Sequence, residues 1–372
     1  MTDKTDARAD DLPSDWNGPS TRAVAVARQA EKGLADRATP FLLNCWYVAA
    51  FSEEVTRTLK SRTLLGRPLV LFRTLDGLPA ALDERCPHRS FPLSRSILIE
   101  DTIVCGYHGL RFGRDGRCTE IPGRTGSPGG IGVRSYALRE QAGVIWIWMG
   151  DQKPAEDLPL GDWASAPDWR HSHGYFHLKA SYISLHENLL DLTHLSFLHE
   201  TTLGTPDYVV APYDVESDEN SGRFAVVRTV APTRLPPVWA RPTGLEGVDA
   251  VRSVQSEFQG PSLHLVTARF RAYHSEAEHE DVARTAHLIT PESATATHYF
   301  LCHGRNFALD DSGVTATMHE ELFAAFHEDV VGLELVEQQV ARTSEADFYQ
   351  IAIPSDRAGL AMRRWLLHRA GS

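Results

Sequence analysis

The chain has 372 residues, of which 42% are hydrophobic and 23% charged, with 37 Lys and Arg against 49 Asp and Glu. This length exceeds the roughly 250–300 residues at which single cores stop growing, which favours two domains. A net charge of −12 without a basic stripe argues against nucleic acid as a partner, because phosphate binding depends on Lys and Arg.

The N-terminal 40 residues form a polar extension. About the first 20 are rich in Asp, Pro, Ser and Gly and are expected to be disordered. Residues 21–37 predict a short helix with Ser20 as its N-cap. The segment MTDKTDARADD lacks the apolar core of a secretory signal, and no apolar run reaches bilayer length. We therefore expect no membrane contact and a cytoplasmic location.

Residues 41–152 predict an all-β domain, because short β-rich runs alternate there with turns. The runs are CWYVAAF, TLLGRPLVLFR, AALDERC, SILIEDTIVCGY and GVIWIWMG. Turn signals lie at Asp76-Gly77 and Asp115-Gly116. Within the transition to the next domain, residues 151–169 are rich in Pro, Asp and Gly and are typical of a linker.

Residues 153–372 predict an α+β domain with an antiparallel sheet. Residues 184–199 are helix-like, residues 318–342 form a long helical pattern, and a last helix is expected near residues 358–368. Antiparallel strands are predicted at residues 223–230, 251–259, 263–273 and 297–305.

The cysteines point to metal binding or catalysis. There are five of them, an odd number spread over the chain, so a disulfide framework is not expected: Cys45, Cys86, Cys105, Cys118 and Cys302. Two belong to short motifs in which one Cys precedes one His, Cys86-Pro-His88 and Cys105-Gly-Tyr-His108.

The two mixed motifs fit a [2Fe–2S] cluster better than zinc. Tetrahedral zinc sites usually pair two Cys as C-x2–4-C and two His as H-x3–5-H, whereas each pair here holds one thiolate and one imidazole. A Rieske cluster takes two thiolates on one iron and two imidazoles on the other. The spacing therefore predicts a Rieske [2Fe–2S] centre.

The stretches CWYVAA, CPHR, CGYHGLRF and CTEIPG resemble the Rieske domain of the aromatic-ring hydroxylating oxygenases, most closely the vanillate and dicamba O-demethylase branch. The resemblance covers about residues 40–345. It implies that Cys86 and Cys105 bind one iron and that His88 and His108 bind the other. It also implies a helix-grip-like (START/Bet v 1-like) catalytic domain.

Two features lie outside the family pattern. Ser90-Phe91 follows the first motif at a place where many relatives carry a smaller residue. We expect a local packing difference there, with the cluster retained. The polar extension of residues 1–40 has no counterpart in the resemblance.

A Rieske cluster moves only single electrons, so the second domain should hold a site that uses them. Residues 186–204 read HENLLDLTHLSFLHETTLG and place His194 and His199 five apart. On an ideal helix their side chains would lie about 140° apart. They can converge on one ion only if the helix ends or bulges between them. Two His with a carboxylate form the facial triad of non-haem Fe(II) oxygenases.

The carboxylate has two candidates, Glu328 and Asp329, in FHEDVVGLELVEQQ on the late helix. They point about 100° apart on a helix, so at most one faces the iron. The family resemblance favours Asp329, because this branch carries its ligand in an E-D-x-V-type stretch. It thus implies a mononuclear Fe(II) held by His194, His199 and Asp329.

Asp191 is predicted to orient His194, since the two are i, i+3 neighbours and a metal-bound His commonly donates its free N–H to a carboxylate. The resemblance adds that Asp191 bridges His194 to a cluster histidine of the neighbouring subunit in a head-to-tail homotrimer. Asn188, one turn earlier, is either an iron-adjacent polar group or a helix-surface residue.

The substrate pocket is expected among the strands after residue 220. Residues 286–309 resemble pocket strands of the dicamba-type demethylases, which makes His287 a candidate donor to a substrate carboxylate or ring oxygen. The alternative for His287 is a strand histidine that faces solvent. Four aromatic residues are candidates for the pocket or for plain core: Trp239, Phe258, Phe270 and Phe300.

The chain has no G-x-G-x-x-G after a strand and no P-loop, so NAD(P)H is expected to be oxidised by a separate flavin/iron–sulfur reductase, with or without a ferredoxin between. We predict the terminal oxygenase of a Rieske non-haem iron monooxygenase. It would use O₂ and two electrons to hydroxylate, demethylate or otherwise dealkylate a small aromatic compound. Two alternatives stay open: an aromatic-ring cis-dihydroxylating dioxygenase, and a Rieske electron-transfer protein without oxygenase activity.

Overall fold

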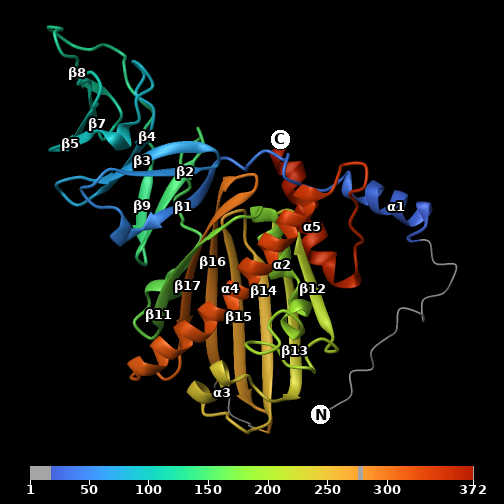
Figure 1. Cartoon of the computed structure of the whole chain (residues 1–372). Coiled ribbons are helices and arrows are strands. Elements are labelled where there is room, and N and C mark those ends of the chain that lie inside the picture. The colour runs from blue at the N-terminus through green and yellow to red at the C-terminus, as the bar shows by residue number, and fades with distance from the viewer. Residues whose placement is uncertain (1–17, 275–279, 372) are drawn as a thin grey trace.

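The computed structural model describes residues 18–274 and 280–371, and these form two parts of different architecture (Figure 1). Most of the segment predicted to be disordered lies outside the described residues. Across the described ranges, none of the helices has the length and apolar character needed to cross a membrane.

The smaller part consists of three antiparallel sheets, which confirms the predicted all-β architecture. The first has the order β1-β10-β9, with β1 (Cys45–Phe51), β9 (Leu138–Gln141) and β10 (Val144–Met149). The second is β2 (Lys60–Leu64), β3 (Arg67–Arg73) and β4 (Pro79–Asp83). The third is β5 (Ile97–Ile99), β6 (Thr102–Val104), β7 (Arg111–Gly113) and β8 (Cys118–Glu120), and it lies at the end remote from the larger part (Figure 1).

Strands β1 and β10 are buried on both faces, which explains their unbroken apolar runs. Tyr47 and Ile147 belong to the core shared with the second sheet. Trp46 and Trp148 belong to a different core, which includes Phe300 of the larger part. The first sheet is therefore the layer through which the two parts pack together.

The larger part is a seven-stranded antiparallel sheet with helices across one face (Figure 1). The strand order is β11 (Arg170–Leu178), β17 (Ala296–Arg305), β16 (Asp281–Ser293), β15 (Leu263–Ala272), β14 (Ala250–Phe258), β13 (Arg223–Thr233) and β12 (Tyr213–Asp218). The α-helices within the described residues are α1 (Thr21–Glu31), α2 (Tyr182–Leu190), α3 (Pro237–Thr243), α4 (Ser312–Arg342) and α5 (Arg357–Ala370). The long helix α4 lies over the sheet, as expected for a helix-grip-like fold.

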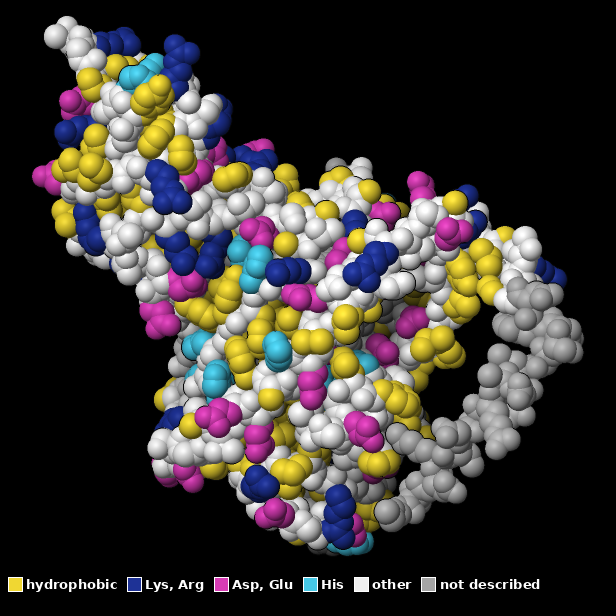
Figure 2. All heavy atoms as spheres, viewed as in Figure 1, with side chains coloured by type: hydrophobic (Ala, Val, Ile, Leu, Met, Phe, Trp, Pro, Cys, Tyr) yellow, Lys and Arg dark blue, Asp and Glu magenta, His cyan; other side chains and the backbone are white. Residues whose placement is uncertain are grey.

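Main-chain hydrogen bonds tie the two parts together. Leu65 N donates to Pro291 O at 2.7 Å, and Gly66 N donates to Glu292 O at 2.9 Å. On the face drawn in Figure 2, acidic and basic side chains are interspersed over both parts. That face therefore carries no stripe of a single charge.

The helix at the N-terminal side was predicted correctly at its start but not at its end. Ser20 caps α1 by accepting a hydrogen bond from Ala23 N at 3.2 Å. The helix stops at Glu31 rather than at residue 37. The linker prediction for residues 151–169 was incomplete, since Leu160 and Trp163 are buried in the core between the parts.

The structure places elements in the larger part that the sequence pattern did not reveal. Strands β11 and β12 were not predicted. The expected helix over residues 184–199 ends at Leu190 and is followed by a short 3-10 turn, Leu192–Ser196. This break positions the second metal site.

Candidate metal centres

The two Cys/His motifs lie on loops with matching backbone geometry. In the first loop, Ser90 N donates to Cys86 O at 2.9 Å, and in the second, Gly109 N donates to Cys105 O at 2.9 Å. Ser90 and Gly109 both have positive φ, +59° and +74°. The chain therefore forms the same turn twice, and each turn presents one Cys and one His.

The four predicted cluster ligands face one another. Cys86 and Cys105 are buried and their thiols interact. His88 and His108 are exposed, with ring centroids 4.5 Å apart. Burial raises the pKa of the Cys86 thiol, and the Cys105 thiol raises it further. Bound iron would replace these thiol protons.

The side chain of Phe91, next to the first motif, packs against the second loop. Phe91 packs against Tyr107 with ring centroids 5.9 Å apart. A Cβ at Gly106 would lie 3.1 Å from Phe91 Cε1 and 3.2 Å from Arg95 O. The Phe91 ring therefore fits beside the second loop because position 106 has no side chain.

The break after α2 brings His194 and His199 together. Asp191 begins the 3-10 turn, and its carboxylate accepts a hydrogen bond from Thr193 N at 2.8 Å. The turn ends at Ser196, before His199. The two imidazole rings consequently converge, with centroids 5.1 Å apart. The helix does end, but at Leu190, before both histidines, whereas the prediction placed its end or bulge between them; only the 3-10 turn ends between the two.

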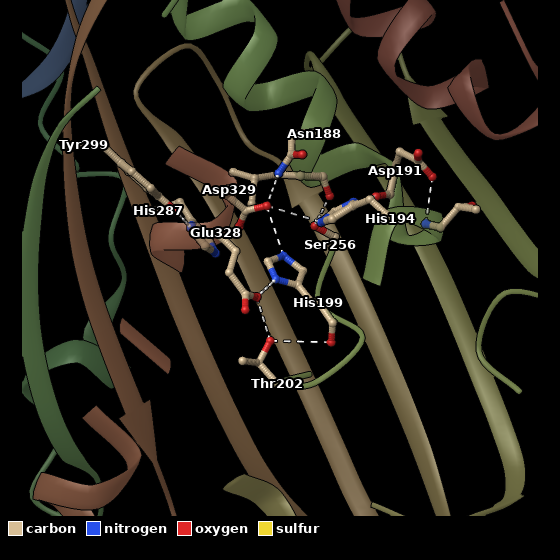
Figure 3. Close-up of polar contacts among 12 residues, drawn as sticks. Asn188, Asp191, His194, His199, Thr202, Ser256, His287, Tyr299, Glu328 and Asp329 are labelled. Atoms are coloured by element: carbon tan, nitrogen blue, oxygen red, sulfur yellow. Dashed lines mark hydrogen bonds and ion pairs between the residues drawn. The ribbon is translucent and has the colours of Figure 1, made fainter. Parts of the chain in front are cut away.

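Helix α4 adds a buried carboxylate to this pair (Figure 3). Asp329 Oδ1 lies 3.0 Å from His199 Nε2 and 3.5 Å from His194 Nε2. Within the described residues, these three side chains form one set of possible metal donors whose atoms all lie within 4.8 Å of one another.

Glu328 lies behind His199 rather than in the donor set (Figure 3). The His199 Nδ1–H donates to Glu328 Oε2 at 2.6 Å, and Thr202 Oγ1 donates to the same oxygen at 2.8 Å. With the Nδ1–H held by Glu328, Nε2 would be the nitrogen of His199 that binds a metal. This supporting role was not predicted from the sequence, in which Glu328 was only a rival candidate for the ligand.

The main chain at Asp191 orients His194. Its carbonyl oxygen accepts the hydrogen bond from His194 Nδ1. The prediction that the carboxylate would do so is wrong for this structure, because that carboxylate caps the 3-10 turn. Asn188 does contact the site: its Nδ2 donates to Asp329 Oδ1 at 2.9 Å.

The arrangement fits a mononuclear iron. The donor atoms of His194, His199 and Asp329 lie close enough together to bind one cation. Burial lowers the pKa of His194, which favours its neutral, metal-binding form. Two His and one carboxylate leave further coordination positions open, as in non-haem Fe(II) oxygenases. The chain thus has a His-His-Asp mononuclear iron site.

The donor set forms part of the wall of a mainly apolar cavity with a volume of about 80 Å³. Apolar walls come from α2, α4 and strands β14, β15 and β16, with Leu189, Leu322, Phe326, Val254 and Val266 among the lining residues. An apolar cavity that binds benzene has a volume of about 150 Å³. We therefore expect the walls to move apart when an aromatic ring binds.

His287 is buried in the cavity wall, so the solvent-facing alternative is wrong. Its Nδ1 lies 2.5 Å from the Tyr299 hydroxyl. Burial lowers the pKa of His287 to about 3. Among the aromatic candidates, Trp239 lines the cavity, whereas the other three are buried outside the wall: Phe258, Phe270 and Phe300.

The sequence analysis missed three polar residues of the wall, namely Arg252, Ser256 and Thr285. Arg252 and Ser256 alternate with outward-facing residues along β14 and thus share its buried face. The signal was available in the period-2 pattern of this strand. A charged residue at an inward position of an apolar strand is a reason to suspect a site.

Comparisons with known proteins agree with the geometry. Residues 45–137 match the Rieske [2Fe-2S] domain, and residues 178–370 match the vanillate O-demethylase oxygenase C-terminal domain. The toluene-4-sulfonate monooxygenase system iron-sulfur subunit of Comamonas testosteroni is 35% identical, with coverage of 88% of this chain and 96% of the relative. The vanillate O-demethylase oxygenase subunit of a Pseudomonas strain is 30% identical, with coverage of 87% and 93%.

A solved structure shares the whole architecture. The crystal structure of dicamba monooxygenase with non-haem iron and dicamba superposes with a TM-score of 0.75 at 28% identity. The match covers 89% of this chain and 98% of that one. Both parts of the fold, and the elements that carry both metal centres, therefore have a counterpart in a protein that binds mononuclear iron.

Proposed function

The chain belongs to the vanillate O-demethylase family of Rieske oxygenases, and on that basis we propose that it is the terminal component of a monooxygenase system that hydroxylates or oxidatively dealkylates a small aromatic compound. The observation that carries the proposal is the position of the His-His-Asp site in the wall of an apolar cavity. Its relatives are named for toluene-4-sulfonate, vanillate and dicamba, which supports a substituted benzene ring as the substrate.

Iron bound by His194, His199 and Asp329 would supply the activation of O₂. The surrounding side chains have separate tasks. Glu328 fixes the ring of His199, and the main chain at Asp191 fixes that of His194. The apolar wall holds an aromatic ring beside the site and keeps bulk water away from it.

His287 is proposed to donate a hydrogen bond to the substrate. Burial keeps its imidazole neutral and raises the pKa of Tyr299 well above its usual range, so the phenol stays protonated. If the Tyr299 hydroxyl donates to Nδ1, the ring proton resides on Nε2. That N–H is then available to a carboxylate or ring oxygen of the substrate.

Electrons are proposed to reach the site from a neighbouring chain. The assigned [2Fe–2S] ligands are Cys86, His88, Cys105 and His108, and the two histidines are exposed. The sheet β5–β8, whose strands β6 and β7 flank the second motif, lies at the outer end of the smaller part (Figure 1). Asp191 is half-buried beside His194, and its carboxylate is proposed to accept a hydrogen bond from a cluster histidine of the neighbouring chain. These features support a head-to-tail homotrimer in which Asp191 bridges the two centres.

The system is proposed to need a flavin/iron–sulfur reductase that oxidises NAD(P)H, with or without a ferredoxin. The test is a reconstitution with such a reductase, NADH, ¹⁸O₂ and a panel of methyl- and methoxy-substituted aromatic compounds. We expect a single labelled oxygen in a hydroxylated product, or formaldehyde from a methoxy group. Two labelled oxygens in one ring product would instead identify a dihydroxylating enzyme.

The Asp329→Ala protein is the control for this experiment. It should retain the cluster but form no product, because the mononuclear iron loses a ligand. Full turnover by this variant would refute the proposed site.

A further inference from the structure

The cavity wall contains a buried guanidinium that the proposed mechanism does not use. Arg252 lies on the inward face of β14, two residues from Val254, and its residue exposure is 3%. It lines the same cavity as His194, His199 and Asp329. A positive charge at this place is unusual, because buried charges are normally paired.

Arg252 is held in place without an ion pair. Its Nη1 donates to Leu203 O at 2.8 Å, and its guanidinium lies 4.7 Å from the centroid of the Tyr208 ring. Its Nε is enclosed and has no hydrogen-bond partner among the residues that the structure describes. Among the described residues no carboxylate forms an ion pair with Arg252, although the charge of Asp207 acts on it. The guanidinium therefore has hydrogen-bonding capacity to spare.

A second buried arginine increases the positive potential. Arg228 lies on the adjacent strand β13 and donates to Tyr208 O at 2.8 Å and to Thr193 Oγ1 at 3.2 Å. Its guanidinium lies 5.2 Å from the centroid of the Tyr208 ring, so one ring contacts two cations. Arg228 itself does not line the cavity, but its charge lies on the strand next to Arg252.

We propose that Arg252 binds an anionic group of the substrate, a carboxylate or a sulfonate, and so makes the enzyme selective for aromatic acids. The proposal rests on the proposed function, since it assigns the substrate class of the same cavity. Once the walls have moved apart to admit the ring, the planar guanidinium can offer Nε and Nη2 as parallel donors to two oxygens of such a group. The bound anion would satisfy the enclosed Nε and neutralise the buried charge. The ring would then lie along the apolar wall that also holds the metal site.

Burial also lowers the pKa of Arg252, which agrees with a cation that lacks a close counter-ion. The rival account is that Arg252 is purely structural: it would brace the loop at Leu203 and be balanced by Tyr208 and Asp207. The two accounts differ in one measurable respect. Only the first predicts that the cavity distinguishes a charged ligand from a neutral ligand of the same shape.

The test is equilibrium binding to the iron-loaded protein by calorimetry, without reductant, so that no turnover occurs. The probes are 4-methoxybenzoate against 4-methoxybenzamide, and toluene-4-sulfonate against toluene-4-sulfonamide. We expect at least one acid to bind about 10- to 100-fold more tightly than its amide, as is typical for hydrogen bonds between charged partners. The two pairs distinguish a carboxylate site from a sulfonate site.

Two variants test whether Arg252 causes the preference for the acid over the amide. Arg252→Gln should abolish the difference between acid and amide, whereas Arg252→Lys should retain part of it because the charge is kept. Arg269→Gln is the matched control, since Arg269 is exposed on the neighbouring strand β15 and pairs with Glu280 at 3.6 Å. It should bind all four probes like the wild type.

Three results would overturn the proposal: equal binding of acid and amide by the wild type, no binding of either acid, or an undiminished preference in Arg252→Gln. Because these measurements involve no catalysis, their outcome is separate from that of the reconstitution. A protein that binds the acids but inserts no oxygen would refute the proposed function alone.

Discussion

The two metal centres are built in opposite ways. The cluster ligands come from two similar loops within one small part, and the imidazoles of His88 and His108 are exposed. The mononuclear site is assembled from two distant segments, and His199 and Asp329 are almost fully buried. An electron relay must present its histidines to another molecule, whereas an oxygenating site must hold a substrate away from water. The contrast in exposure follows from these two tasks.

The largest effect is expected when the Asp329 carboxylate is removed. Asp329→Ala should abolish oxygenation, an effect larger than the roughly 10- to 100-fold loss typical of residues that support a ligand. The cluster should be unaffected, since its ligands lie in the other part of the molecule. Visible absorption and electron paramagnetic resonance of the reduced protein check the cluster, and product formation checks the site. Loss of both signals would mean that the centres are not independent.

Glu328 should have the next largest effect. In Glu328→Gln the side chain can still accept a hydrogen bond from His199, but the charge that polarises the ring is gone. We expect iron affinity or activity to fall by about 10- to 100-fold. Iron retention during dialysis against a chelator measures this. The matched control is Glu320→Gln, an exposed position on the same helix, which should behave as the wild type. Equal retention by the two variants would contradict the role given to Glu328.

These two acidic neighbours also show what the sequence could predict about the site. The donor types and the segments were identified, because His-x4-His and Glu-Asp are visible in the chain. Helix geometry alone could not choose between Glu328 and Asp329, and the family resemblance made that choice. The hydrogen bond from His199 to Glu328 depends on where α4 packs over the sheet, which no local pattern encodes.

A similar limit applies to the fold. β1 was predicted at its observed bounds, since both of its faces are buried and the apolar run is continuous. The end of α2 was not predicted. Asp191 stops the helix by capping the next turn, while the surrounding residues keep a helical pattern. β11 was missed because its His-rich sequence carries little apolar alternation. The cluster ligands could be predicted from local sequence alone, because each of two short motifs holds one Cys and one His.

The buried histidines of the larger part should make the protein sensitive to acid. Burial lowers the pKa of His186 to about 4 and that of His303 to about 3. Above pH 6.5 these groups are neutral in both states and contribute nothing. As the pH falls below about 6.5, only the unfolded chain binds the protons, so each histidine lowers the free energy of unfolding by up to about 1.4 kcal/mol per pH unit.

Urea unfolding at pH 7, 6 and 5 measures this slope. The free energy of unfolding of His303→Gln should depend less steeply on pH than that of the wild type, because one histidine no longer contributes. A wild-type stability that is flat over this range would contradict the prediction that these histidines stay neutral in the folded protein.

The smallest effect is expected in the cluster loops, where Ser90 and Gly109 occupy equivalent positions with positive φ. Ser90→Gly removes a side chain from a conformation unfavourable to it, but adds freedom to the unfolded chain, so stability should change by less than about 1 kcal/mol. Gly109→Ser should be more harmful, because its Cβ would lie 3.0 Å from Pro122 Cγ. Unfolding temperature and the cluster absorption spectrum distinguish the two. Equal effects of the two substitutions would contradict the steric role given to Pro122.

The most direct test of the two-centre account is the iron and acid-labile sulfide content of the purified, iron-replete protein. The account predicts about three irons and two sulfides per chain, with only the iron outside the cluster lost in Asp329→Ala. A wild-type value of about two irons, unchanged by Asp329→Ala, would contradict it and leave a protein that only carries electrons.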